Sequence, residues 1–138
     1  EHPKLTVVSD AIIARMKLQD NGIIVGTKLQ DYEYIIVDGN SKDTTLQIIK
    51  SYSSRFSNIK IISEPDRGIY DAMNKGVRNS TGDYIYFLNF GDYLVDKYVL
   101  ERVVSSFASK QDYYYGNIAK DEKIVSQNGK NSLFYDCI

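Results

Sequence analysis

The sequence predicts an α/β fold with a mainly parallel central sheet. Short runs of β-branched and aromatic residues recur along the 138 residues, and segments with a helical spacing of apolar residues lie between most of them. Polar turn residues follow several of these runs. Strands and helices that alternate in this way build βα units around a parallel sheet. A single layered domain over residues 1–138 is the organisation that this length favours.

The first two predicted strands are short apolar runs. Leu5 to Ser9 is the first, and apolar residues on one side predict a helix over Ala11 to Leu18. Tyr34 to Val37 is the second, and Asp38 and Gly39 close it. The pattern therefore predicts a strand that ends in a turn at residues 38 and 39.

A helix and a third strand are predicted next. Apolar residues at spacings of three, three and four predict the helix: Leu46, Ile49, Tyr52 and Phe56. Ser41 and Asp43 are candidate N-caps of this helix. The third strand is Ile59 to Ile62, and a polar segment, residues 64–68, connects it to the next helix.

That next helix is predicted to carry Ile69, Met73 and Val77 on one side. Tyr84 to Leu88 follows the turn at residues 80–82 and is apolar or aromatic at every position. A strand that is covered on both faces has this composition. We therefore expect the fourth strand to be covered on both faces and to lie centrally in the sheet.

The clearest amphipathic pattern comes after Asp96, where four apolar residues recur at i, i+3, i+4 and i+7: Leu100, Val103, Val104 and Phe107. Tyr113 to Tyr115 and Ile118 to Val125 are predicted as later strands, with a bend at residues 116–117. Residues 126–138 are polar and then apolar, with no closing element. This ending is expected of a chain that stops after the first half of a larger fold.

Composition excludes several classes of function. Lysine and arginine total 17 against 18 acidic residues, so no excess positive charge is present to bind a nucleic acid backbone. Cys137 is the single cysteine and His2 the single histidine, which excludes an internal disulfide and a zinc cluster. No apolar run has the roughly 20 residues of a membrane span. We expect a reducing, cytoplasmic location, with any membrane contact peripheral.

Candidate site residues follow three of the predicted strands. They are Asp38 to Ser41, Glu64 to Arg67, and Asn89 to Asp92. In an open parallel sheet, ligands bind beyond the carboxyl ends of the strands. Asp38 has the chemistry to bind a ribose or base, Arg67 the charge to face phosphates, and Asp92 the carboxylate to ligate Mg²⁺ or Mn²⁺.

Each of these segments has a structural alternative. Asp38 to Ser41 and Asn89 to Asp92 are both rich in turn residues, so each also fits a plain turn. Arg67 also fits a solvated loop charge, or a partner of Asp66 or Asp71. A carboxylate at the end of a buried strand is costly without a partner, which favours a functional role for Asp92.

Three segments, in order and at matching spacing, resemble family 2 glycosyltransferases. Tyr32 to Ser41 is similar to the strand of this family that ends in Val-Asp-Gly before a helix start. Ser63 to Gly76 resembles the segment between its donor-site strands. Thr81 to Asp92 resembles its Gly-Asp-Tyr strand leading to a metal-binding Asp-x-Asp motif, and residues 112–117 continue the likeness more faintly.

The resemblance implies a GT-A (Rossmann-like) three-layer fold that binds a UDP- or GDP-sugar with Mg²⁺ or Mn²⁺. It implies that the metal residue is Asp92 and that donor nucleotide-binding residues are Asp38, Gly39, Asn40, Ser41, Arg67 and Asn89. The implied activity is inverting sugar transfer to a saccharide or lipid-linked acceptor in bacterial polysaccharide biosynthesis, at the inner face of the membrane. The catalytic base of the family is expected beyond Ile138, so activity of the 138 residues alone is not expected.

The chain departs from the family pattern at two places. The Asp-x-Asp motif reads Asn89-Phe90-Gly91-Asp92, which keeps only the final carboxylate, and the first strand leads into Ser9-Asp10 where the family has an aromatic-Asn turn. Two other functions stay open. One is a non-catalytic nucleotide-sugar-binding module, and the other is a receiver-like or flavodoxin-like signalling domain.

Overall fold

The computed structural model describes residues 3–10, 31–40, 42, 44–54, 56–88, 94, 96, 98–116, 118–120 and 123–125. Its principal strands are β1 (Leu5–Asp10), β2 (Glu33–Asp38), β3 (Ile59–Ser63) and β4 (Tyr84–Phe87). Its helices are α2 (Thr45–Ser53), α3 (Ile69–Arg78), α4 (Val99–Ser106) and the 3₁₀ turn η1 (Phe107–Ser109). Two short strands, β5 (Ile118–Lys120) and β6 (Lys123–Val125), complete the described elements.

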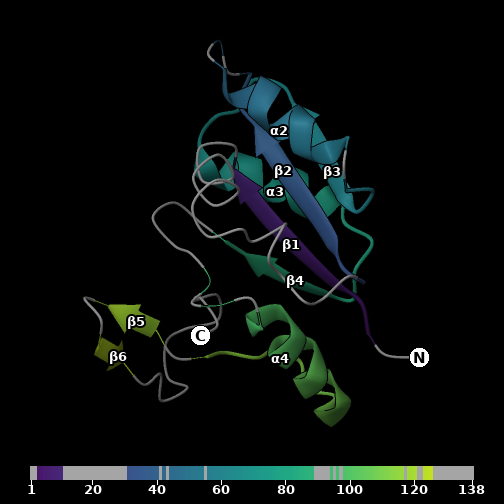
Figure 1. Ribbon diagram of the computed structural model, residues 1–138, viewed down its shortest axis with the longest axis vertical. Coiled ribbons are helices and arrows are strands. Elements are labelled where there is room, and N and C mark those ends of the chain that lie inside the picture. Colours follow the sequence, from purple (N-terminus) through teal and green to yellow (C-terminus); the bar gives the residue numbers. More distant parts are fainter. Residues whose placement is uncertain are drawn as a thin grey trace.

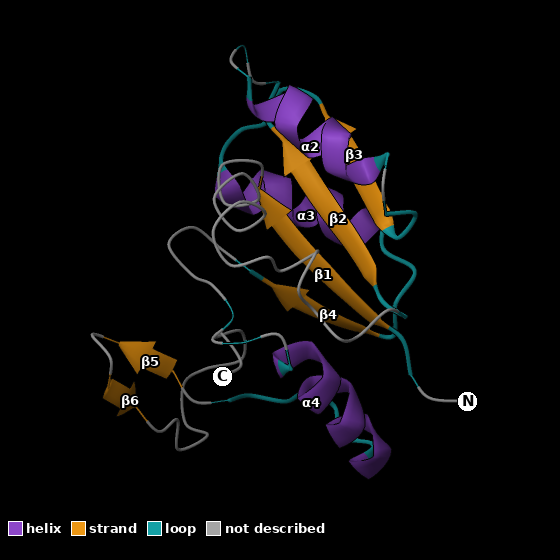
Figure 2. Cartoon of the chain, in the orientation of Figure 1, coloured by secondary structure: helices purple, strands orange, loops and turns teal. Residues whose placement is uncertain are grey.

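The four principal strands form a parallel sheet in the order β3-β2-β1-β4 (Figures 1 and 2). Each of the four strands predicted up to residue 88 is present, within one residue at either end. The order 3-2-1-4 is that of a Rossmann-type sheet, whereas a flavodoxin-like sheet has the order 2-1-3-4-5. The fold prediction is therefore confirmed, and the signalling-domain alternative is excluded.

The sheet is covered on both faces because neighbouring residues along each strand point to opposite sides. On β2, for example, Tyr34 and Ile36 belong to one apolar cluster, and Ile35 and Val37 belong to the other. The first cluster includes residues of α2 and α4, and the second includes Ala72 of α3. The result is three layers, with α2 and α4 on one face and α3 on the other (Figure 1).

The amphipathic helix predicted after Asp96 is present as α4 and η1. Leu100 and Phe107 are buried in the first cluster, with Val103 and Val104 packed against it. The helix predicted over Ala11 to Leu18 lies outside the described residues. None of the helices in the described ranges combines the length and hydropathy that a membrane span requires.

The side of α3 predicted to carry Ile69, Met73 and Val77 is only partly buried, with Met73 packed against the second apolar cluster. Ile69 and Val77 are both 40% exposed, whereas the buried residues of the helix are Ala72, Lys75 and Gly76. The reason is close packing, because a methyl group on Gly76 would lie 2.3 Å from Val8 Cγ1 on β1. Ala72 and Gly76 therefore lie closest to the sheet, and Ile69 and Val77 remain at the surface.

Three further predictions are corrected. Within the described sheet, β4 pairs with β1 alone and lies at the end of the order β3-β2-β1-β4, while its apolar run agrees with coverage of both faces. Residues 113–116 form no strand; instead the Tyr114 ring packs against Tyr84 and Phe107. The single strand predicted over residues 118–125 is two antiparallel strands, β5 and β6.

Candidate functional site

Asp38 is the last residue of β2 and is fully buried. Its register partner on β3 is Ser63, whose hydroxyl donates a 2.7 Å hydrogen bond to Asp38 Oδ2. A carboxylate in this position needs such donors, because burying an unpaired charge is costly. The structure therefore places the predicted ligand-binding acid at the carboxyl edge of the sheet, in an orientation that Ser63 helps to fix.

Gly39 and Asn40 follow directly after the end of β2. Gly39 and Asn40 are exposed, and Asn40 has φ 66°, in the left-handed region that asparagine tolerates better than most residues. This conformation of Asn40 is compatible with the turn interpretation of the segment. Ser41, the next predicted site residue, lies outside the described residues.

The loop formed by residues 64–68 folds against this turn. The Glu64 N–H donates to the Asp38 carbonyl oxygen at 3.0 Å, which ties the start of the loop to the end of β2. A methyl group on Gly39 would lie 2.8 Å from Asp66 Oδ2, so glycine is what allows Asp66 to sit there. Two of the three predicted segments are therefore brought together.

Arg67 is exposed on this loop. Its backbone N–H, two residues before α3 begins, donates a 2.9 Å hydrogen bond to Asp71 Oδ2. This hydrogen bond, with the positive charges of Lys75, Arg67 and Arg78, lowers the pKa of Asp71. The expected contact between Arg67 and Asp71 is present, but it fixes the backbone and leaves the guanidinium at the surface.

The third predicted segment starts where β4 ends. Phe87 of β4 is the register partner of Val8 of β1, and Val8 is in turn the register partner of Ile35 of β2. Two strand spacings separate β4 from β2, which is about 10 Å. Asn89 and Asp92 lie outside the described residues, so the structure does not test their roles.

The metal prediction also stays untested, because its proposed ligand, Asp92, lies outside the described residues. Among the residues that the structure describes, no group of three or more His, Cys, Asp or Glu side chains is arranged to hold a metal ion. At the carboxyl edge, the described acids Asp38 and Asp66 are engaged with Ser63 and with the Gly68 N–H. The described side chains alone do not form a cation site.

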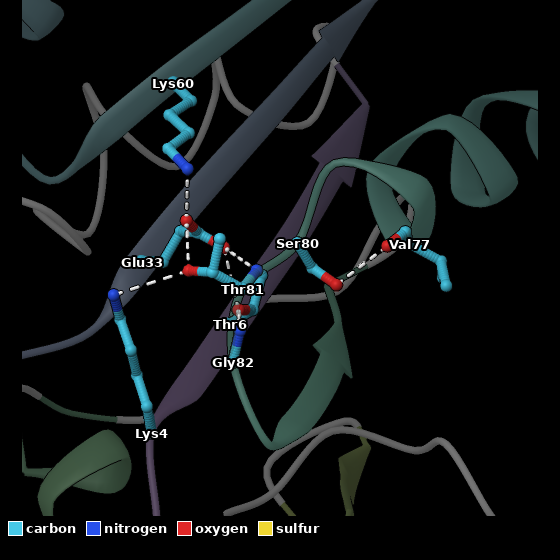
Figure 3. A network of polar contacts seen from close by, with 8 residues as sticks. All are labelled: Lys4, Thr6, Glu33, Lys60, Val77, Ser80, Thr81 and Gly82. Atoms are coloured by element: carbon cyan, nitrogen blue, oxygen red, sulfur yellow. Dashed lines mark hydrogen bonds and ion pairs between the residues drawn. The ribbon is translucent and has the colours of Figure 1, made fainter.

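A second buried acid lies at the opposite edge of the sheet (Figure 3). Glu33, the first residue of β2, accepts hydrogen bonds from the Thr6 hydroxyl and from the Thr81 N–H and hydroxyl, at 2.8–2.9 Å. Lys60 Nζ lies 2.6 Å from Glu33 Oε2. Burial raises the pKa of Glu33, but these donors outweigh it and lower the pKa to about 2.

The amino edge of the sheet also borders an open groove of about 1260 Å³. It is lined by residues that include Pro3, Asp83, Tyr84, Phe107 and Gln111. Since Tyr84 is level with Leu5 at the start of β1, the groove is at the end of the sheet remote from Asp38. It is not the site predicted by the strand-end residues.

Three residues that make contacts at these two edges were missed in the sequence: Ser63, Glu33 and Lys75, whose Nζ lies 3.4 Å from Glu64 Oε1 and 3.7 Å from Asp71 Oδ2. Glu33 stands at the start of an otherwise apolar strand, and Lys75 follows Asp71 at the i, i+4 spacing of a helical ion pair. Both signals were available. Ser63 had none, because its role depends on β3 lying beside β2.

Comparison with known proteins identifies the family. The model of Glycosyl transferase family 2 matches residues 12–136, which is most of the chain. The chain belongs to glycosyltransferase family 2. This confirms the resemblance carried by the three strand-end segments.

Curated relatives within the family are longer proteins. A PGL/p-HBAD biosynthesis glycosyltransferase of Mycobacterium bovis is 36% identical over 91 residues, which cover 64% of this chain and 36% of the relative. A cholesterol galactosyltransferase of Borreliella burgdorferi is 34% identical over 77 residues, covering 56% of this chain and 21% of the relative. The matched part is thus about a third or less of these relatives.

Solved structures share the fold. The Pyrobaculum calidifontis mannosyltransferase PcManGT, in complex with GDP-Man and Mn²⁺, superposes with a TM-score of 0.63 at 21% identity, over 78% of this chain and 33% of that one. S. aureus TarS 1–349, in complex with UDP-GlcNAc, gives 0.65 at 18% identity, over 94% of this chain and 36% of that one. With these neighbours, the three-layer GT-A fold of this family 2 chain is confirmed.

Proposed function

We propose that this family 2 chain forms the donor-binding part, as one domain, of an inverting, metal-assisted glycosyltransferase. It would bind a UDP- or GDP-sugar and pass the sugar to a saccharide or lipid-linked acceptor in bacterial polysaccharide biosynthesis. One observation carries the proposal: in a family 2 fold, the buried Asp38 and the loop that bears Arg67 meet at the carboxyl edge of the sheet. Ligands of Rossmann-type sheets bind at this edge.

The proposed roles follow from side-chain chemistry. Asp38 accepts hydrogen bonds from the base or ribose, and the turn of Gly39, Asn40 and Ser41 lines the nucleotide. Arg67 faces the diphosphate, where its permanent charge favours a phosphate partner.

Asn89 and Asp92 complete the proposed site after β4, with Asp92 as the ligand of Mg²⁺ or Mn²⁺. When bound, such an ion stabilises the negative charge of a departing diphosphate. The Mn²⁺ and GDP-Man in the PcManGT complex support this choice of cofactor and donor class. The complexes of TarS with UDP-GlcNAc and with UDP support a uridine nucleotide equally.

The proposed reaction is a single displacement. The acceptor hydroxyl oxygen forms a bond to the anomeric carbon, the bond from that carbon to the diphosphate breaks, and the nucleoside diphosphate leaves. A general base takes the hydroxyl proton. We assign that base to none of the residues 1–138.

Titration calorimetry with UDP and with GDP, each with and without Mn²⁺, tests the donor site. We expect one nucleotide to bind in a Mn²⁺-dependent manner. In Asp38→Ala, affinity should fall by about 10- to 100-fold, as expected when hydrogen bonds to a charged group are lost. Asp92→Ala should weaken the dependence on Mn²⁺.

Asp83→Ala is the matched control, because Asp83 is an exposed acid at the opposite edge, bonded to the Lys4 N–H. It should leave nucleotide affinity unchanged. The proposal would be contradicted by a nucleotide affinity that does not depend on Mn²⁺, or by the absence of binding of both nucleotides. Binding by a full-length protein that transfers no sugar would indicate a non-catalytic module instead.

A further inference from the structure

Lys75 is a buried cation on α3, only 8% exposed. Its Nζ donates a 2.6 Å hydrogen bond to the Pro65 carbonyl oxygen, and it lies 3.4 Å from Glu64 Oε1 and 3.7 Å from Asp71 Oδ2. Burying an ammonium group is costly unless it is paired and hydrogen-bonded. All three oxygen partners come from the loop after β3 or the first turn of α3.

The packing of α3 explains why Lys75 reaches this loop. Gly76 allows the helix backbone to lie directly against Val8 of β1. Side chains of a helix tilt toward its N-terminus. Lys75, the neighbour of Gly76, is therefore held near the sheet and directed back toward residues 64–68.

Asp71 extends the network to Arg67. Its Oδ2 accepts the Arg67 N–H at 2.9 Å and lies 3.7 Å from Lys75 Nζ. The hydrogen bond from Arg67 and the nearby cations lower the pKa of Asp71, so it is ionised at neutral pH. A single carboxylate oxygen thus links the Lys75 ammonium to the backbone of Arg67.

The same loop is fixed to the end of β2 by contacts of its own. The Glu64 N–H binds the Asp38 carbonyl oxygen, and Asp66 packs against Gly39 while its Oδ1 accepts the Gly68 N–H at 3.0 Å. Gly68 has φ 117°, a conformation that side chains disfavour. Lys75 is therefore bonded to a segment that both contacts Asp38 and carries Arg67.

We propose that Lys75, acting with Asp71, is a positioning residue of the nucleotide site: it locks residues 64–68 so that Arg67 is presented beside Asp38. The inference rests on the proposed function, because it assigns Lys75 a purpose at that site. Lys75 does not touch the ligand in this proposal. It acts through the backbone of Pro65 and, through Asp71, of Arg67.

The test compares, in the full chain, two lysines that pair with acids at opposite edges of the sheet: the buried Lys75 and the half-exposed Lys60. Lys75→Met should weaken binding of UDP or GDP with Mn²⁺ about tenfold, because the loop loses a charged hydrogen bond that holds it in place. Lys60→Met removes the ion pair to Glu33 and should leave that affinity within twofold of the wild type. Lys75→Arg, which keeps the charge, should restore most of the affinity.

Hydrogen exchange gives a readout that does not need a ligand. In Lys75→Met the Arg67 and Gly68 amides should exchange at least fivefold faster, while amides of β2 keep their protection. If Lys75→Met fails to fold, Glu64→Gln and Asp71→Asn test the same network with milder changes, since Glu64 is 55% exposed. They should show the same two effects at smaller size.

The outcomes separate the two proposals. If the wild type binds a nucleotide and Lys75→Met binds it equally well with unchanged exchange, only the positioning role fails, even if the melting temperature falls. If the wild type binds neither nucleotide, the proposed function fails and the positioning role falls with it. Faster exchange together with weaker binding, both reversed in Lys75→Arg, supports the positioning role.

Discussion

The two ends of β2 carry buried acids in contrasting surroundings. Glu33 is surrounded by donors from β1, from β3 and from the turn before β4, and these come from the folded sheet itself (Figure 3). Asp38 is paired with Ser63 and lies beside an exposed turn and an exposed arginine loop. A buried acid at a strand end is therefore not sufficient to indicate a binding site. The two edges differ in the residues that surround the acid and in the exposure of those residues.

This contrast has a physical basis. At the Glu33 edge, the donors are fixed by the pairing of strands, so the carboxylate contributes to stability and leaves little for a ligand to satisfy. At the Asp38 edge, the neighbours belong to loops, which in folds of this type carry function on a rigid scaffold. We therefore expect changes at the first edge to affect unfolding, and changes at the second to affect nucleotide binding.

The largest expected effect is the acid sensitivity of the Glu33 edge. The pKa of Glu33 is about 2 in the folded chain, below its ordinary value of 4.5. Because the pKa of this carboxyl is lower in the folded state than in the unfolded state, its contribution to stability is complete above the unfolded-state pKa. That contribution is lost as the pH falls through the folded-state pKa. The window is therefore from about pH 4.5 down to about pH 2, with about 3 kcal/mol at stake.

Urea unfolding at pH 7, 4 and 3 measures this loss. Glu33→Gln is the control, because it removes the titrating group but keeps the size of the side chain. It should be less stable than the wild type at pH 7 and lose less on acidification. Parallel pH curves for the two proteins would show that Glu33 is not the group responsible.

The second expected effect distinguishes two glycines, one at each edge. A methyl group on Gly82 would lie 2.3 Å from Thr6 Oγ1 and 2.8 Å from the Thr6 backbone nitrogen, which cannot move aside. Gly82→Ala should therefore lower the free energy of unfolding by about 2 kcal/mol, the range of an overpacked core. Nucleotide affinity should not change.

Gly39→Ala should give the reverse result. Its new methyl group would meet the Asp66 carboxylate, the end of a side chain that can rotate, so stability should fall by less than about 1 kcal/mol. Moving Asp66 displaces the loop of Arg67, and nucleotide affinity should drop. Thermal melts and calorimetry on both variants test the pair, and equal losses of affinity in the two would remove the distinction between the edges.

The sequence was sufficient for the four strands of the parallel sheet, but not for the later strands. Residues 34–37 and 84–88 are apolar at every position, and such runs are a local signal that does not depend on the neighbours. The segments of Asp38 and Arg67 were found because they follow predicted strands, and the structure brings these two segments together. The roles of all the predicted site residues, Asp38 and Asp92 included, stay predictions.

What the sequence did not reveal depends on contacts between distant residues. The buried face of α3 is set by the approach of Gly76 to Val8, a packing distance that apolar spacing does not encode. Tyr114 has strong strand propensity, yet its ring is used to cover Tyr84 and Phe107. Propensity and periodicity describe a segment alone, whereas these positions are decided by what packs against them.

The smallest expected effect concerns Ser63, the residue for which sequence gave no signal. Ser63→Ala removes the 2.7 Å hydrogen bond to Asp38 Oδ2 without adding bulk. Ser63 is exposed as a residue, so the loss of stability should be below about 1 kcal/mol. If that bond sets the orientation of the Asp38 carboxylate, nucleotide affinity should fall about three- to tenfold, which corresponds to the net free energy of one hydrogen bond. Ser63→Thr keeps the hydroxyl and should bind as the wild type does, whereas unchanged affinity in Ser63→Ala would show that this hydrogen bond does not set the orientation of the Asp38 carboxylate.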